Sequence, residues 1–171
     1  KYIYSLRNSY TDVGKLLEKY DLIANFAKSI IHKSLFILGK GKMFHIAEEA
    51  ALKIKELSYC HAEAYSGSAL KHGPFSLLED GFPVILIINK DKYYNKMISA
   101  YEEVKCRGAD ILVITNDSDF DHHKKIIINT DSTISEILYI IPFQIIAYEM
   151  SLNRNINPDY PRNLAKVVTV E

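Results

Sequence analysis

The sequence lacks several features that would place it at once in a class of protein. Its 171 residues include only two cysteines, Cys60 and Cys106, which are too few for a disulfide framework and suit a reducing compartment. No apolar run reaches the roughly 18 residues of a membrane span, and the first residues lack the layout of a signal peptide. Basic and acidic residues number 21 each, so net charge gives no attraction toward nucleic acid or an anionic membrane. These absences predict a soluble cytoplasmic protein without a nucleic-acid or membrane partner.

Motifs for common cofactors and metals are also missing. The Gly-Lys-Gly segment at residues 39–41 follows an apolar run, but Phe44 stands where a dinucleotide-binding fingerprint needs its third glycine. No Walker-type phosphate loop is present, and a plain turn from strand to helix is the better interpretation of residues 39–41. The histidines and cysteines, including the adjacent Cys60 and His61, do not have the spacing of a zinc site. We therefore expect neither a cofactor nor a metal.

Short apolar runs alternate with helical patterns along the chain. The runs that predict buried strands are at residues 34–38, 83–88, 110–115 and 125–129. The patterns that predict helices are at residues 11–32, 47–59, 93–107 and 133–152. The last helix opens with a capping box formed by Thr133 and Glu136, and Pro142 should kink or restart it. This alternation predicts a doubly wound, Rossmann-like α/β fold, whose ligands gather at the carboxyl ends of the strands.

The second predicted helix carries a charged stripe. Glu49, Lys53 and Glu56 fall within an arc of about 60° on a helix, apart from its apolar face. One interpretation is a surface ion pair between residues four apart, worth a few tenths of a kcal/mol. The other is a functional site, because Leu52 and Cys60 lie on or beside the same stripe. Spacing alone leaves both open.

A histidine and a lysine are further candidates. His72 is followed by Gly73 and Pro74, whose turn would fix the direction of the imidazole, although loop histidines are more often surface or packing residues. Lys166 lies in an apolar C-terminal tail. If that tail docks, desolvation lowers the pKa of the amine and frees part of it to act as a nucleophile. The alternative is a lysine that extends from a packed strand to solvent.

Several segments resemble the C-terminal part of the glutamine–fructose-6-phosphate aminotransferases, and the resemblance extends from about residue 36 to residue 171. The matching stretches are AALKIKELSY at residues 50–59, HAEAY at 61–65, LKHGP at 70–74 and PRNLAK at 161–166. The resemblance implies a SIS (sugar isomerase) domain, with a mostly parallel five-stranded sheet flanked by helices. It divides the chain into a linking helix at residues 1–34, a second SIS domain at 35–156 and a C-terminal active-site tail at 157–171.

The resemblance also implies roles for individual residues. Glu56 matches the base that moves a proton between C1 and C2 of the sugar. His72 matches the histidine that opens the sugar ring and reaches into the neighbouring subunit's site, and Lys166 matches the lysine that forms a Schiff base with the ketose. Residues that match the substrate-binding lining of the same site are Ala165, Lys53 and Glu49. One departure is at residues 66–69, where Ser-Gly-Ser-Ala replaces a segment that carries a carboxylate in many relatives.

The implied partners are fructose 6-phosphate and glucosamine 6-phosphate, a second copy in a homodimer, and two upstream parts of the same protein. Those parts are a first SIS half that holds the sugar phosphate and a glutaminase domain. We expect this chain to be a fragment with little or no activity alone. Two other functions stay open: a non-catalytic module that senses sugar phosphates, and a glutamine-independent SIS deaminase or isomerase.

Overall fold

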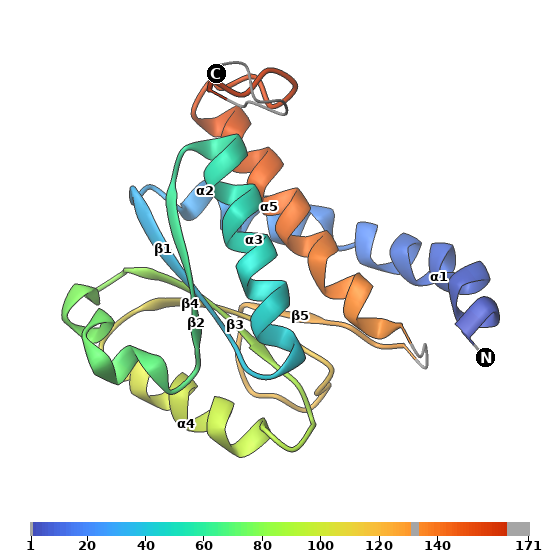
Figure 1. Cartoon of the computed structure of the whole chain (residues 1–171), viewed down its shortest axis with the longest axis horizontal. Helices are drawn as coiled ribbons and strands as arrows, with labels where there is room; N and C mark the ends of the chain where they lie inside the picture. Colours follow the sequence, from blue (N-terminus) through green and yellow to red (C-terminus); the bar gives the residue numbers. More distant parts are fainter. Residues whose placement is uncertain (1, 131–133, 164–171) are drawn as a thin grey trace, which may run out of the picture.

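The computed structural model describes residues 2–130 and 134–163, and at its centre is a five-stranded sheet whose neighbouring strands all run parallel (Figure 1). Its strands are β1 (Ser34–Gly39), β2 (His61–Ser66), β3 (Pro83–Ile88), β4 (Asp110–Thr115) and β5 (Lys125–Ile127). They lie in the order β2-β1-β3-β4-β5, so the chain reverses its direction of winding between β1 and β3. The predicted α/β fold with a five-stranded parallel sheet is confirmed.

Helices cover both faces of this sheet. One face carries α2 (Tyr20–Ser29), α3 (Lys42–Ser58) and α5 (Ile140–Asn153). The other face carries α4 (Tyr94–Lys105) and the short 3-10 helices η1 (Ala69–His72) and η2 (Pro74–Leu77). The 3-10 helix η3 (Ser135–Tyr139) precedes α5, and α1 (Tyr2–Leu17) projects away from the body of the molecule (Figure 1). Among the helices in the described part of the chain, none combines the length and apolar character needed to cross a membrane.

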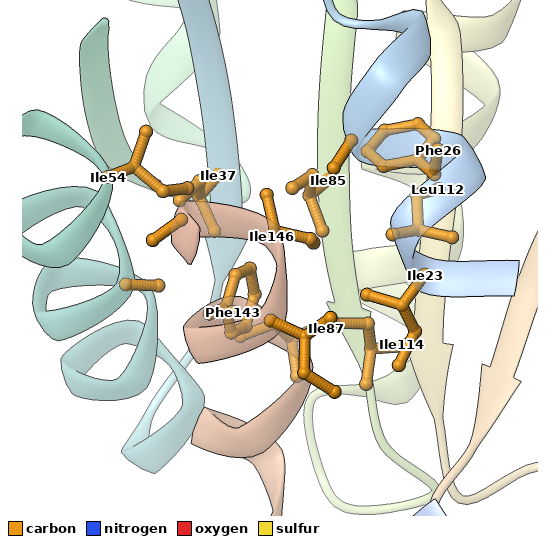
Figure 2. Close-up of a cluster of buried hydrophobic side chains, with 14 of the residues drawn as sticks. Ile23, Phe26, Ile37, Ile54, Ile85, Ile87, Leu112, Ile114, Phe143 and Ile146 are labelled. Atoms are coloured by element: carbon orange, nitrogen blue, oxygen red, sulfur yellow. The ribbon is translucent and has the colours of Figure 1, made fainter. Parts of the chain in front are cut away.

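The strands are apolar throughout because each face of the sheet supports its own core. In β3, Ile85 and Ile87 point into the core under α2, α3 and α5, whereas Leu86 points into the core under α4. Figure 2 shows the first of these cores, where Phe143 of α5 and Ile54 of α3 meet side chains of the central strands. Burial of alternate residues on opposite faces explains why these runs lack the polar alternation of half-exposed strands.

One predicted helix near the N-terminus differs from the structure. The helix predicted over residues 11–32 is in fact two helices, α1 and α2, which meet at Glu18 and Lys19. The break turns α2 so that its apolar side packs on the sheet, where Ile23 and Phe26 are buried. Tertiary packing therefore overrides the continuous helical periodicity of this segment.

Strand β2 was not predicted from the apolar pattern. It is an edge strand in which only Ala62 is fully buried, so it has no apolar run to reveal it. The preceding helix α3 also begins at Lys42 rather than at residue 47. In the last predicted helix, α5 begins at Ile140 and places Pro142 in its first turn, where the missing N–H is not needed. Pro142 thus marks a restart, and the predicted cap Thr133 lies outside the described residues.

Gly39 ends β1, the strand beside which the order of winding changes. Because Gly39 has no side chain, the first turn of α3 can pack directly against it. A Cβ on Gly39 would lie 2.5 Å from the carbonyl carbon of Met43 and 2.9 Å from the nitrogen of Phe44, both backbone atoms. We expect Gly39→Ala to lower the free energy of unfolding by about 1–3 kcal/mol, because helix α3 must shift.

Gly14 in α1 provides the matched control. A Cβ there would meet nothing within 4 Å, so Gly14→Ala should instead stabilise the chain by about 0.5–1 kcal/mol through helix propensity. Urea unfolding of the two variants beside the unchanged chain measures both effects. Equal effects of the two substitutions would contradict the close approach of α3 to Gly39.

Candidate active site

Helix α3 presents three charged side chains that are in contact with one another. The Lys53 ammonium donates to the Glu56 carboxylate over 2.8 Å and lies 3.7 Å from the Glu49 carboxylate. The hydrogen bond to Glu56 is the main reason that the pKa of Lys53 is raised above its usual value. Lys53 is therefore held as a cation beside two carboxylates at neutral pH. The structure brings together these three members of the predicted site.

The opposite side of α3 fixes the direction in which this charged cluster faces. Ala47, Ala50 and Ile54 are buried against the sheet and α5, with no exposed surface. The side chains of Lys53 and Glu56 keep 35% and 27% of their surface exposed, so the cluster is half-buried rather than fully solvated. This partial burial distinguishes it from a free surface ion pair, whose charges are screened by water.

Residues 161–163 of the C-terminal tail lie directly beside Glu56. The backbone N–H of Arg162 donates to the Tyr59 hydroxyl over 2.7 Å, and the Arg162 guanidinium stacks over the Tyr59 ring at 4.1 Å. A small pocket between the end of α3 and this segment is lined by Lys55, Glu56, Tyr59, Pro161, Arg162 and Asn163. Ala165 and Lys166 lie outside the described residues.

Tyr59 and Arg162 were not singled out by the sequence. Tyr59 adopts a left-handed conformation with φ of 56° at the end of α3, which turns the chain toward β2 and directs the ring toward residue 162. Tyr59 was only the last residue of a matching motif, and Arg162 only a neighbour of Pro161. Their contact joins residues far apart in the chain, so no local pattern could have revealed it.

His72 lies on the other side of the sheet from the α3 cluster. It ends η1, and its neighbour Leu70 is buried in the core under α4. Lys71 pairs with Glu103 of α4 over 2.6 Å, which ties η1 to this face. The His72 side chain is exposed, and Gly73 with φ of 132° turns the chain directly after it. One chain therefore does not bring His72 together with Glu56.

The predicted ligand region at the carboxyl ends of the strands holds a polar cluster in which each charge has a partner. The Lys90 ammonium contacts the buried Asp117 carboxylate over 2.7 Å, and the Tyr94 hydroxyl donates to the same carboxylate over 2.5 Å. These bonds lower the pKa of Asp117 and raise that of Tyr94 to about 12. Such a cluster joins the loops after β3 and β4.

The segment at residues 66–69 places two hydroxyls beside a lysine. The Lys40 ammonium lies 3.3 Å from the Ser66 hydroxyl and 3.5 Å from the Ser68 hydroxyl. With hydroxyls in place of a carboxylate, these contacts are hydrogen bonds from an ammonium to neutral acceptors and not an ion pair. Within the described residues, no group of three or more His, Cys, Asp or Glu side chains is placed to hold a metal ion.

A second polar cluster occupies the edge of the sheet beside α3. The Tyr65 hydroxyl donates to the Glu63 carboxylate, which also lies 2.9 Å from the His61 ring. These contacts lower the pKa of Glu63, and burial together with Glu63 raises that of Tyr65 to about 12. The cluster faces a shallow groove that Glu48 and Lys55 of α3 also line. The HAEAY motif therefore forms one wall of that groove.

Comparisons with known proteins show the family and the fold of the chain. The family model for the SIS domain matches residues 30–154. Curated relatives are 36–48% identical over 91–99% of the chain, and the chain spans 26–30% of their length. One of them, from Thermococcus kodakarensis, is named glutamine–fructose-6-phosphate aminotransferase (isomerizing) and is 39% identical over 99% of the chain and 30% of its own length.

Two solved structures show the same arrangement of strands and helices. The C-terminal domain of glucosamine-fructose-6-phosphate aminotransferase from Francisella tularensis matches with a TM-score of 0.81 and 26% identity, over 92% of this chain and 46% of that one. A glucosamine-6-phosphate deaminase from Thermotoga maritima matches with a TM-score of 0.69 and 26% identity, over 92% of this chain and 48% of that one.

Proposed function

The chain belongs to the SIS domain family, and on that premise we propose that it is half of the isomerase part of a glutamine–fructose-6-phosphate aminotransferase. The names of its curated relatives support this assignment, and so does its identity of up to 48% to them. The product would be glucosamine 6-phosphate, made from fructose 6-phosphate and ammonia released from glutamine. Because the chain spans about a quarter of those relatives, the rest of the activity is assigned to other parts of the full-length protein.

The proposed chemistry divides between the α3 cluster and the tail. The Lys166 amine attacks the C2 carbonyl of the open sugar and water leaves, which forms an imine. Ammonia then adds to the imine carbon and the Lys166 amine leaves, so that the C2 imine now carries the ammonia nitrogen. In its protonated form this imine acidifies the C1–H bond, the Glu56 carboxylate takes that proton, and a proton returned at C2 gives the 2-amino aldose. Lys53 and Glu49 bind the substrate beside Glu56, and Ala165 lies next to the sugar.

The position of His72 supports a site shared between subunits. An imidazole can give and take a proton near neutral pH, which suits ring opening. Since the sheet separates His72 from Glu56 in one chain, His72 would serve the site of a second copy, and the protein would act as a homodimer. The two cysteines, which are both free, support a cytoplasmic location.

The observation that carries the proposal is the pocket shared by Glu56 and residues 161–163 of the tail. It sets the base and the start of the lysine-bearing tail beside one another, although more than a hundred residues separate them in sequence. If Glu56 only formed a surface ion pair, or if the C-terminal end of the chain were frayed, this contact would not be expected.

Trapping the imine tests the proposal in the full-length protein. Borohydride reduces an imine to a stable secondary amine, so incubation with fructose 6-phosphate and borohydride should attach the sugar phosphate to the peptide that contains Lys166. Lys166→Ala should abolish this label in mass spectra, whereas Lys55→Ala, at a lysine of the same pocket, should retain it. Tight binding of fructose 6-phosphate without any label would contradict the proposal and favour a sugar-phosphate sensor.

A glutamine-independent deaminase or isomerase is the second candidate, and the similarity to the Thermotoga maritima deaminase favours it. The two enzymes differ in their source of nitrogen. Conversion of fructose 6-phosphate that requires glutamine supports the aminotransferase. Conversion that proceeds equally well without glutamine and with ammonium alone supports the deaminase.

A further inference from the structure

Tyr59 has a backbone conformation that is unfavourable for a residue with a large side chain. It ends α3 with φ of 56° and ψ of 23°, in the left-handed region. Helices that end in this conformation usually have glycine there, because a Cβ costs free energy. The other residues with positive φ that are not glycines, within the described part of the chain, are Asn155 and Asn163. Asparagine tolerates this region and tyrosine does not, so Tyr59 is the exception.

The side chain that makes this position unfavourable contacts Arg162 in two ways. The Tyr59 hydroxyl accepts the backbone N–H of Arg162 over 2.7 Å, and the Arg162 guanidinium lies 4.1 Å from the centre of the Tyr59 ring. Among the residues that the structure describes, the ring belongs to neither apolar core of the sheet. Core packing therefore does not explain why a tyrosine occupies a position that favours glycine.

The contact lies where the tail meets the pocket of Glu56. Tyr59, Arg162 and Glu56 all line that pocket. Lys166 follows Arg162 by four residues, and four residues span at most about 14 Å. The point at which Arg162 is held therefore limits how far the Lys166 amine can move away from Glu56.

We propose that Tyr59 is a positioning residue that holds the tail at Arg162 so that the Lys166 amine meets the sugar beside Glu56. An unfavourable backbone conformation persists at functional sites when the side chain it presents is needed there. The hydroxyl fixes the main chain of Arg162 and the ring fixes its side chain, so both the place and the direction of the tail are set. A segment that is held at one end loses less conformational freedom when its amine attacks the sugar.

This inference rests on the proposed function in taking Lys166 as the nucleophile, but its first test needs no reaction. If trapping at Lys166 fails while substitution of Tyr59 still releases the tail, the proposed chemistry alone fails. If trapping succeeds and substitution of Tyr59 neither releases the tail nor slows the label, the positioning role alone fails.

Trypsin cleavage after Arg162 measures whether Tyr59 holds the tail in the full-length protein. The Arg162 guanidinium must leave the Tyr59 ring before it can enter the specificity pocket of the protease. Tyr59→Gly removes both contacts, so peptide 163–171 should be released about tenfold faster or more, as measured by mass spectrometry. Tyr59→Phe keeps the ring and loses only the hydroxyl, so release should be about two- to tenfold faster.

Asn155→Gly is the matched control for Tyr59→Gly. Asn155 has nearly the same backbone conformation, with φ of 54°, but it is exposed and does not line the pocket of Glu56. Trypsin should release the tail of this variant at the rate of the unchanged protein. Neither substitution should lower the urea midpoint of unfolding, because glycine is favoured at both positions.

The rate of imine trapping separates a positioning role from a structural one. Tyr59→Gly should slow the labelling of Lys166 by fructose 6-phosphate and borohydride about tenfold or more in a single turnover. The KM for fructose 6-phosphate should stay within about twofold, since the proposed role of Tyr59 is to hold the tail and not to bind the sugar. Asn155→Gly should change neither value.

Two outcomes would overturn the inference. Equal release of peptide 163–171 from Tyr59→Gly and Asn155→Gly would show that Tyr59 does not hold the tail. A urea midpoint that falls for Tyr59→Gly but not for Asn155→Gly would show that the tyrosine serves the stability of the fold instead.

Discussion

Replacing Glu56 with Gln should lower the conversion of fructose 6-phosphate to glucosamine 6-phosphate by about 10²–10⁴-fold in the full-length protein. The amide has nearly the shape of the carboxylate but cannot take a proton from C1. Glu56 can serve as the base because α3 holds it beside the Lys53 ammonium and next to residues 161–163 of the tail. The loss should appear in kcat more than in KM, since the substrate contacts of the site are retained.

Glu48→Gln is the matched control for this experiment. Glu48 is on the same helix, but it contacts the exposed His45 over 2.9 Å and lies away from the Lys53 cluster. Its loss should leave the rate within about twofold of the unchanged protein, since exposed ion pairs contribute little. An unchanged rate for Glu56→Gln, or equal losses for the two variants, would remove Glu56 from the role of base. Thermal unfolding of both variants shows whether either change acts through stability instead.

Replacing Phe143 with Ala should lower the free energy of unfolding by about 3–5 kcal/mol. The Phe143 ring has no exposed surface and packs between α5, α3 and the central strands (Figure 2). Its removal leaves a cavity that the surrounding strands cannot fill, because parallel strands hydrogen-bonded on both sides do not shift independently. A loss of this size is a large share of the roughly 5–15 kcal/mol that stabilises a domain.

Leu152→Ala on the same helix is the control, because Leu152 keeps 44% of its surface exposed. Its cost should be within about 0.5 kcal/mol, which is usual for a surface substitution. Urea unfolding followed by circular dichroism gives both values from the transition midpoints. A loss below about 1 kcal/mol for Phe143→Ala would contradict the packing of α5 against the sheet.

The sequence was sufficient to predict the strands that are buried on both faces of the sheet, because each of them is a continuous apolar run. The strands β3 and β4 were predicted with the ends that the structure has, since each is a run of apolar residues between turn or polar residues. Strand β2 was missed because an edge strand with one fully buried residue carries no such run. The boundary between α1 and α2 was missed because periodicity continues through Glu18 and Lys19, while packing on the sheet decides where the helix turns.

The candidate site, too, could be predicted from the sequence only in part. Helical spacing placed Glu49, Lys53 and Glu56 on one stripe, and the structure shows them in contact. Spacing could not show that Arg162 docks on Tyr59 beside this stripe, because the contact joins residues 103 positions apart in the chain. Nor could it show that His72 lies on the other face of the sheet.

The sequence by itself therefore determined the α/β class, the central strands and the charged side of α3, because each depends on residues close together in the chain. Only the tertiary structure decided which of the candidate residues meet, which face of the sheet each occupies, and that one apolar side of α1 is exposed. These properties depend on strand order and on the packing of distant segments, and neither is encoded in local periodicity.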